Sequence, residues 1–221
     1  MPKMNVRKVF RRTHDPIWQM QLGVVAIILL QFFTDDTFLP YNKFVIIVFE
    51  AFLLVMLGIV TSDAYHRVSR TRRFVALVLI ALVAAINIFS LIFLLRALIL
   101  NHEIIEGARL LQSGLTIYIT NIFIFALLYW EIDGDGPDRR VAKSRKPDFL
   151  FPQMIHKGIS GERWLPGFLD YLYVSTTNVT NFASADTVPL SHRAKLMMMI
   201  QALVSVVIVV LVAARAIGIM Q

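Results

Sequence analysis

The sequence contains no cysteine, which excludes disulfide bonds, thiolate nucleophiles and thiolate metal sites. It also lacks the Gly-x-Ser-x-Gly pattern of hydrolases, the His-Glu-x-x-His pattern of zinc proteases and the glycine-rich loops that bind nucleotides. Five histidines are present, but none is spaced three or four residues from another metal ligand within an expected helix. We therefore expect that the protein is not an enzyme and has no metal centre or cofactor.

Long apolar runs dominate the chain. Hydrophobic residues make up 57% of the 221 positions and the mean hydropathy is +0.66, values typical of membrane proteins. Five runs are long enough for transmembrane helices: 17–33, 42–60, 74–100, 115–130 and 191–217. We expect no cleavable signal peptide, because the first apolar run lacks a small-residue cleavage site. Tyr129 and Trp130 end the fourth run and are expected to anchor it at the membrane interface.

Basic residues gather in three segments. Residues 1–16 hold five Lys and Arg, 62–73 hold four and 132–166 hold seven, whereas the intervening loops hold one each, Lys43 and Arg109. Cytoplasmic loops of membrane proteins carry the excess of basic residues. This bias predicts a protein of the plasma (inner) membrane with a cytoplasmic amino terminus and an external carboxyl terminus. The net charge of +7 then indicates contact with anionic lipid headgroups, and not with nucleic acid.

The segment 168–181 has the apolar and polar mixture of a helix but cannot cross a bilayer. Its 14 residues would extend about 21 Å at ~1.5 Å per residue, against ~30 Å of hydrocarbon. A polar hairpin at 182–190 follows, and then the long apolar run 191–217. Non-helical backbone at membrane depth is tolerated only where protein or a water-filled cavity receives it. The order therefore favours a re-entrant half-helix that enters and leaves on the same side.

Polar residues recur in this stretch in the order Asp-x-Leu-Tyr-x-Ser-x-Thr-x-x-Thr. After five intervening residues the pattern Asp-x-x-Pro follows. The positions are Asp170, Leu172, Tyr173, Ser175, Thr177, Thr180, Asp186 and Pro189. This spacing resembles the pore module of potassium-channel-like cation channels. The resemblance implies a module at 113–221, with 115–130 as outer helix, 131–166 as loop, 168–181 as pore helix and 191–217 as inner helix.

The selectivity-filter positions differ from that family. They are Asn181, Phe182, Ala183, Ser184 and Ala185, so that both glycines of the family's filter are alanine here. A Cβ in a left-handed conformation costs roughly 1–2 kcal/mol per residue, so a carbonyl-lined potassium filter is not implied.

The resemblance still implies a homotetramer that passes a monovalent cation. The residues expected at the pore and filter are Thr177, Thr180, Asn181, Phe182, Ala183, Ser184, Ala185 and Asp186. Those expected to support the pore helix are Asp170, Tyr173 and Ser175. The charge count places the hairpin on the cytoplasmic side, as in ionotropic glutamate receptors and opposite to potassium channels.

Two other functions remain open. The loss of both filter glycines favours a non-conducting membrane scaffold that binds partners through a degenerate pore loop. The other open function is a small transporter that uses Glu50. A carboxylate in the middle of the second apolar run is costly, and such residues in membrane spans commonly have a function. Arg96 lies toward the same side of the membrane and is a possible partner in an intramembrane charge pair; otherwise Glu50 carries a proton or pairs with another helix.

The expected fold is all-α, with five transmembrane helices and one re-entrant pore half-helix. Residues 1–16 form a basic cytoplasmic terminus and 17–112 a peripheral region of three helices. Asp133-Gly-Asp-Gly136 matches part of a calcium loop but lacks its third carboxylate and its bidentate glutamate. We interpret that segment as a turn that ends the fourth helix.

Overall fold

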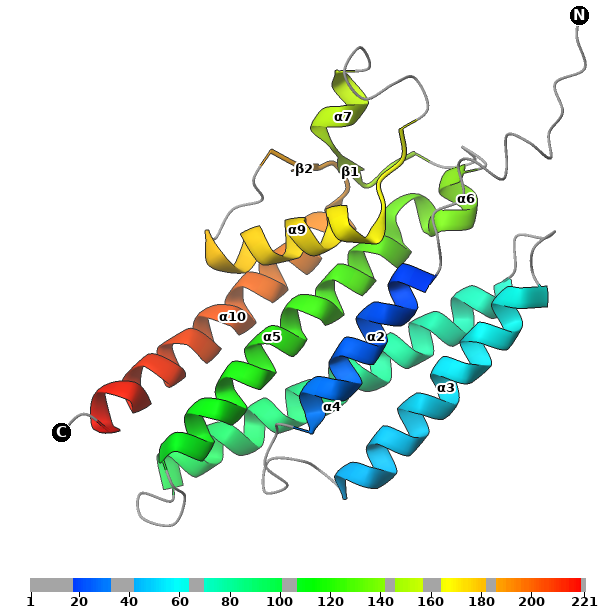
Figure 1. Cartoon of the computed structure of the whole chain (residues 1–221). Helices are drawn as coiled ribbons and strands as arrows, with labels where there is room; N and C mark the ends of the chain where they lie inside the picture. Colours follow the sequence, from blue (N-terminus) through cyan, green and yellow to red (C-terminus); the bar gives the residue numbers. More distant parts are fainter. Residues whose placement is uncertain are drawn as a thin grey trace, which may run out of the picture.

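The structure, a computed structural model, describes residues 18–32, 42–63, 70–100, 107–141, 146–156, 164–181 and 186–219. It is mostly helical, as expected (Figure 1). The long helices are α2 (Trp18–Gln31), α3 (Lys43–Asp63), α4 (Arg70–Leu100), α5 (Gly107–Ile132) and α10 (His192–Ile219). The shorter elements are η2 (Asp133–Asp135), α6 (Pro137–Val141), β1 (Phe149–Leu150), α7 (Pro152–Ile155), α9 (Phe168–Thr180) and β2 (Val188–Pro189).

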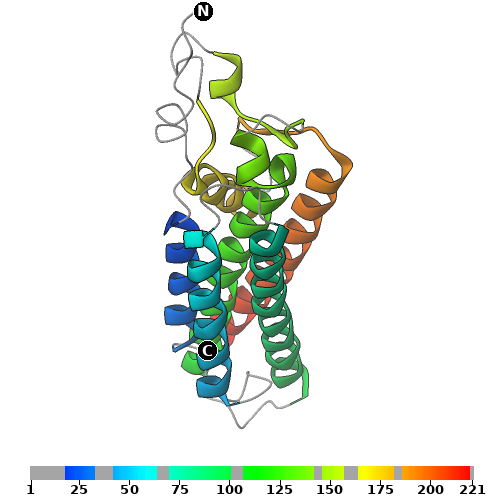
Figure 2. The ribbon, with the colours of Figure 1, turned by 90° about the vertical axis from the view of Figure 1, so that its right-hand side faces the viewer.

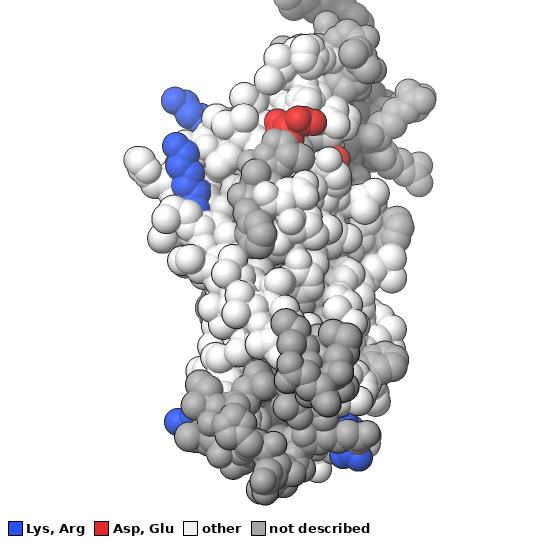
Figure 3. Space-filling model, turned by 90° about the vertical axis from the view of Figure 1, so that its left-hand side faces the viewer, with Lys and Arg blue, Asp and Glu red and all other residues white. Residues whose placement is uncertain are grey.

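Three of the described helices are long and apolar enough to cross a membrane. They cover Thr71–Ala97, Ala108–Asp135 and His192–Ala214. The described part of the chain therefore has the composition of a multi-pass membrane protein. In Figure 3, which views the face beside α10, charged side chains lie toward the two ends and a broad uncharged band lies between them.

α5 is the central helix of the bundle. It packs against α2, α4, α9 and α10, while α3 packs on the outside against α4 and α2. Tyr129 and Trp130 of α5 are completely buried in the main apolar core. The expectation that these two aromatics anchor the helix at the membrane interface is therefore wrong, because neighbouring elements cover the end of α5.

Two helix boundaries differ from expectation. α5 begins at Gly107, eight residues before the expected start at position 115, because Ala108 to Gln112 are mostly good helix formers and extend it. α4 begins at Arg70, so Arg72 and Arg73 belong to its first turns and not to a basic loop. Helix boundaries follow local propensity and tertiary contacts, which hydropathy does not register.

α9 is a half-length helix that crosses the bundle at one end (Figures 1 and 2). The loop elements η2, α6, β1 and α7 lie at the same end. After α9 the chain returns there, because β2 pairs with β1 in an antiparallel two-stranded sheet, with Phe149 opposite Pro189 and Leu150 opposite Val188. The segment before α9 and the segment after it thus lie at the same end of the bundle.

Candidate functional site

α9 begins against α2 and the end of α5. The Asp170 carboxylate accepts a hydrogen bond of 2.7 Å from the Gly167 N–H and so caps the first turn. Phe168 packs so closely on Gly23 of α2 that a Cβ there would lie 2.8 Å from its ring. Asp170, expected to support the pore helix, therefore fixes where α9 starts.

A neutral polar cluster fixes the other half of α9. We define this α9 cluster as Ser175 and Asn178 of α9, Tyr129 of α5 and Gln201 of α10. The Gln201 Oε1 accepts hydrogen bonds from the Tyr129 hydroxyl at 2.6 Å and from Asn178 Nδ2 at 2.9 Å. Gln201 Nε2 donates to Ser175 Oγ at 2.6 Å, and that hydroxyl donates to the Ile122 carbonyl at 2.7 Å.

The α9 cluster is saturated, because each of its side-chain polar groups has a partner. Asn178 Nδ2 also donates to the Met198 carbonyl of α10 at 3.0 Å. A neighbouring bond from Asn121 Nδ2 to Ser205 Oγ, at 3.0 Å, joins α5 and α10 directly. Of these residues only Ser175 is among the expected site residues. Asn178 and Gln201 escape the sequence analysis because their meeting depends on how three helices pack.

The structure distributes the other expected pore residues over two faces of α9. Thr177 is buried and its hydroxyl donates to the carbonyls of Tyr173 and Val174. Tyr173 is 56% exposed, on the face away from α5 and α10, and Thr180 is exposed with its hydroxyl bonded to the Thr176 carbonyl. Of the three expected supports, Asp170 and Ser175 thus make hydrogen bonds that fix α9 within the chain, whereas Tyr173 faces outward.

Asn181, the first of the filter positions, and Asp186, which follows the last, are both exposed. Phe182, Ala183, Ser184 and Ala185 lie outside the described residues. Ser191 caps α10, with its hydroxyl oxygen accepting a hydrogen bond of 3.2 Å from the Ala194 N–H. The Asp186 carboxylate is therefore not needed for that cap.

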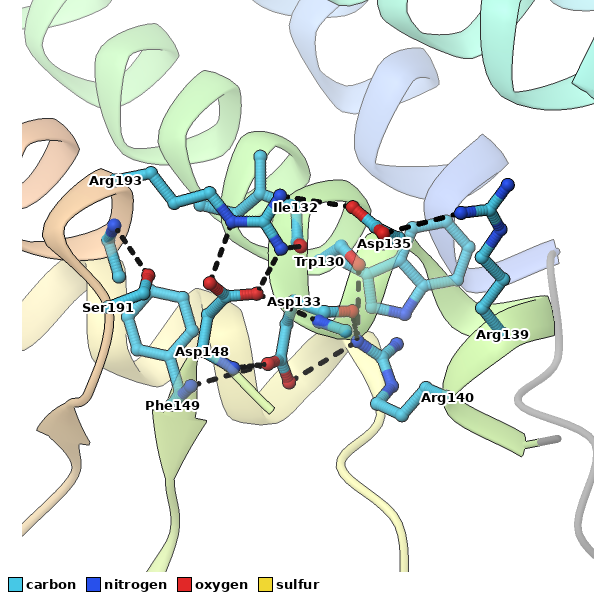
Figure 4. Close-up of polar contacts among 12 residues, drawn as sticks. Trp130, Ile132, Asp133, Asp135, Arg139, Arg140, Asp148, Phe149, Ser191 and Arg193 are labelled. Carbon is cyan, nitrogen blue, oxygen red and sulfur yellow. Dashed lines mark hydrogen bonds and ion pairs between the residues drawn. The ribbon is translucent and has the colours of Figure 1, made fainter. Parts of the chain in front are cut away.

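Beside the start of α9 lies a network of ion pairs that we call the charged cap, formed by Asp133, Asp135, Arg140, Asp148 and Arg193 (Figure 4). Asp133 is completely buried and accepts hydrogen bonds from the N–H groups of Asp148 and Phe149 and from the Tyr171 hydroxyl of α9. Arg140 lies 3.4 Å from its carboxylate. One carboxylate thus joins the end of α5 to β1, α6 and α9.

Arg193 fastens the start of α10 to the same cap. Its guanidinium contacts both oxygens of Asp148, at 2.7 and 2.5 Å, and donates to the Ile132 carbonyl at 2.9 Å. Burial raises the pKa of the Asp148 carboxyl, but its hydrogen bonds, chiefly with Arg193, outweigh that effect and hold the pKa below its ordinary value. Asp148 is therefore held as a carboxylate.

The Asp-Gly-Asp-Gly segment ends α5 with a sharp turn. Three successive residues have positive φ, namely Gly134 at 59°, Asp135 at 65° and Gly136 at 101°. The two glycines adopt such angles without strain. The Gly134 N–H donates to Asp148 at 3.0 Å. The two carboxylates of this segment face arginines and backbone N–H groups, so the segment acts as a helix-ending turn, as interpreted from the sequence.

A further ion pair, outside the charged cap, joins α4 to α5 at the same end of the bundle. Arg72 Nη1 lies 2.8 Å from Glu131 Oε1, and both side chains are buried. The guanidinium also stands 5.9 Å from the centre of the Trp130 ring. Arg72, which the sequence analysis assigns to lipid headgroups, therefore has a structural role inside the fold.

The charge pair expected between Glu50 and Arg96 is not formed. Gln31 Nε2 donates to both carboxylate oxygens of Glu50 at 2.9 Å, while Arg96 is exposed. α3 and α4 are antiparallel, with Ile46 packed near Ile86. Four residues further along α3, Glu50 lies at the level of about position 82 in α4, some 14 residues, or about 21 Å, from Arg96.

A small polar pocket lies next to Gln31. It is lined by Gln31 of α2, by Asn87 and Ser90 of α4 and by Thr120 of α5, together with Val83, Ile86 and Ile117. The pocket has room for about one water molecule. The sequence analysis mentions none of these four polar residues as a site, because they come from three separate helices.

No protein-family model, curated protein or solved structure matches this chain. The functional interpretation is therefore built on its own residues and their geometry.

Proposed function

We propose that the chain is a membrane protein whose α5, α9 and α10 form a pore module, and that four copies assemble around an axis to pass monovalent cations. The observation that supports this proposal best is the position of α9. It is a half-length helix attached to two long, antiparallel, apolar helices, and the chain reaches it and leaves it at the same end of the bundle. Non-spanning helices of this kind are accommodated in membranes where protein surrounds their polar ends.

The depth of α9 along α5 agrees with a re-entrant half-helix. Ser175 bonds to the Ile122 carbonyl, ten residues before α5 ends at Ile132. At ~1.5 Å per residue this is about 15 Å, half of the ~30 Å hydrocarbon thickness. In this proposal α4, α5 and α10 cross the membrane, and so do the longer apolar runs 17–33 and 42–60, to which α2 and α3 belong. The charged cap then lies on the cytoplasmic side and the carboxyl terminus lies outside.

The exposed face of α10 supports assembly. Only 22% of its apolar stretch is buried within one copy. Large apolar side chains are exposed along its length, among them Leu196, Met199, Leu203, Val206 and Val210. Such a face suits either lipid or the same helix of another copy, and closed rotational symmetry is the common solution for identical subunits.

Substitution of Asp186 is the most direct test of this proposal. In a fourfold assembly four such carboxylates surround one mouth, as in the acidic rings of cation channels. Purified protein in liposomes should show a flux of potassium or thallium ions. At low ionic strength Asp186→Asn should reduce this flux about tenfold, because fixed charge raises local cation concentration by ~10–10³. Asp186→Glu, which keeps the charge, should retain most of it.

One result would correct the proposal and another would overturn it. Equal flux in wild type and Asp186→Asn would remove Asp186 from the ion path. A stable tetramer with no flux would favour the non-conducting scaffold. The presence of Ala183 and Ala185 in place of the filter glycines also favours that function. The mass of the detergent-solubilised assembly, measured beside the flux, separates these outcomes.

A further inference from the structure

Gln31 and Glu50 form a buried polar pair inside the bundle, away from α9. Glu50 is completely buried and Gln31 is 5% exposed. Gln31 turns its amide Nε2 toward the carboxylate and lies 2.9 Å from each carboxylate oxygen. One amide cannot balance the charge of a carboxylate in an apolar surrounding, where an uncompensated ion is very costly.

No cationic side chain of the described chain balances Glu50. α2 carries no charged residue between Trp18 and Gln31. On α3 the other charged residues are Lys43 and Asp63, at its two ends. On α4 they are the arginines of the first turns and the exposed Arg96. The described residues therefore leave the charge of Glu50 without a compensating partner.

The other end of the Gln31 amide is unsatisfied. Within the described chain, Gln31 Oε1 is buried and has no hydrogen-bond partner. Gln31 also lines the small pocket, whose other polar walls are Asn87, Ser90 and Thr120, all at least nine-tenths buried. An unpaired oxygen facing hydrocarbon would be costly, so native structures normally give such groups a bound partner.

We propose that this pocket binds one small monovalent cation, of the sodium class, and that Glu50 supplies the balancing charge through Gln31. The ligands would be oxygen atoms of Gln31, Asn87, Ser90 and Thr120. Gln31 would then have its donor end on the carboxylate, as observed, and its acceptor end, which is otherwise without a partner, on the cation.

The chemistry of the walls selects the class of ion. Amide and hydroxyl oxygens are hard ligands that suit alkali and alkaline-earth ions, whereas zinc and copper prefer nitrogen and sulfur. Calcium takes six to eight oxygens, often from several carboxylates, and magnesium keeps several of its waters. A pocket with room for about one water and a single nearby carboxylate fits an ion of charge one.

This site shares only α5 with the pore module. Its residues come from α2, α3, α4 and α5, and none of them belongs to α9 or α10. The site would give the protein a fixed or exchangeable cation in its peripheral half, whether or not α9 and α10 form a channel.

The test is carbodiimide labelling of Glu50, because carbodiimides modify protonated carboxyl groups in apolar surroundings. Purified wild-type protein in detergent is labelled at constant pH and constant ionic strength, in sodium, potassium or choline chloride, and the Glu50 peptide is followed by mass spectrometry. Sodium or potassium should slow labelling saturably. At ten times the dissociation constant the rate should fall about tenfold, because about one site in eleven remains empty.

Thermal unfolding followed by tryptophan fluorescence supplies a readout that does not depend on labelling. The same cation should raise the melting temperature of wild type saturably, and this rise should disappear in Glu50→Gln and in Thr120→Val. Arg96→Gln, on the exposed face of α4, is the matched control and should keep the full response. If a variant fails to fold, the labelling rate and the melting temperature of wild type are enough to decide whether the pocket binds a cation.

Two outcomes would overturn the proposal. Labelling that depends on pH but is unchanged by every alkali cation would show that Glu50 carries a proton and the pocket a water. If neither the labelling rate nor the melting temperature changes with any alkali cation, the pocket is a purely structural water site. Flux through the pore module is not measured in these experiments, so they fail or succeed apart from the channel proposal.

Discussion

The two halves of the bundle treat buried polar groups differently. Around α9, the α9 cluster and the charged cap are saturated: every carboxylate of the cap and each side-chain polar group of the cluster has a partner. Around α2 and α3, Gln31 and Glu50 form a pair in which the charge is not balanced and one oxygen is unpaired. Saturation favours a structural role, since a satisfied network holds one geometry.

The unsaturated half has the property that a binding site requires. A buried polar group without a partner costs about 1–3 kcal/mol, which a bound ion or water can recover. The α9 cluster and the charged cap have no such deficit, although within the described chain Arg73 Nε beside the cap is buried without a hydrogen-bond partner. The cluster and the cap serve to hold a half-helix that local sequence alone could not fix. The following predictions test this difference, beginning with the largest expected effect.

Replacing Asp133 by alanine should cause the greatest loss of stability. Its carboxylate holds two backbone N–H groups, Tyr171 and Arg140, all at a completely buried position. Removing one partner of a buried ionic group costs about 3–5 kcal/mol. Denaturant-induced unfolding in detergent measures the loss. Asp135→Ala is the control: its arginine partners are partly exposed, so about 1 kcal/mol is expected. Equal losses would contradict the central role of Asp133.

The same substitution in the two halves should have different effects. Gln201→Leu leaves Ser175, Asn178 and Tyr129 short of a partner and should destabilise the fold by roughly 1–3 kcal/mol. Gln31→Leu takes a hydrogen-bond donor from Glu50 but also removes an unpaired oxygen, so without alkali cations it should cost less than Gln201→Leu. Unfolding in choline buffer compares the two. A larger loss for Gln31→Leu would reverse the assignment of structural and binding roles.

Acid should weaken the saturated half through Asp148. The folded-state pKa of this carboxyl lies below its unfolded value of about 3.9. Its ionised form therefore contributes stability at pH values above about 4, and the contribution is lost as the pH falls through the folded-state pKa. The melting temperature of wild type should fall more steeply below about pH 4 than that of Asp148→Asn. Parallel curves for the two proteins would show that Asp148 is not the titrating group.

Glu50→Gln should have the smallest effect. The side chain keeps its shape and can still bond to Gln31, while the unbalanced charge disappears. In choline buffer its free energy of unfolding should be no lower than that of wild type, because the charge that is removed has no balancing partner among the described residues. A loss of several kcal/mol there would indicate that the ionised Glu50 is already balanced by the protein, and would contradict its role in an unsaturated site.

The course of the chain could be predicted from composition and spacing. Apolar runs separated by basic loops predict the long helices, and the polar stretch at 168–181 predicts a half-length helix, which α9 matches within one residue. These features depend on local hydrophobicity and helix propensity. The resemblance to a pore module also implies that Ser175 supports this helix; in the structure its hydroxyl donates to the Ile122 carbonyl of α5.

The partners of buried polar side chains could not be predicted in this way. Glu50 was expected to pair with Arg96, but antiparallel packing of α3 and α4 keeps these two residues apart. The packing of α2 on α3 brings Gln31 to Glu50 instead. Arg72 was expected at the lipid headgroups, although it is buried with Glu131, and no expectation was formed for a partner of Arg193, which is bound to Asp148. Hydropathy assigns a residue to a depth in the membrane, whereas partners depend on the rotation of each helix about its axis.

By itself the amino-acid sequence determined a helical membrane composition, the order of long and short helices and the turn that ends α5, because each follows from neighbouring residues. Tertiary structure decided the rest. Helices α5, α9 and α10 bring together the four residues of the α9 cluster, and α2, α4 and α5 bring four polar side chains around one pocket. The physical reason is that single polar residues on separate helices carry no local signal until packing sets them side by side, where each must find a partner.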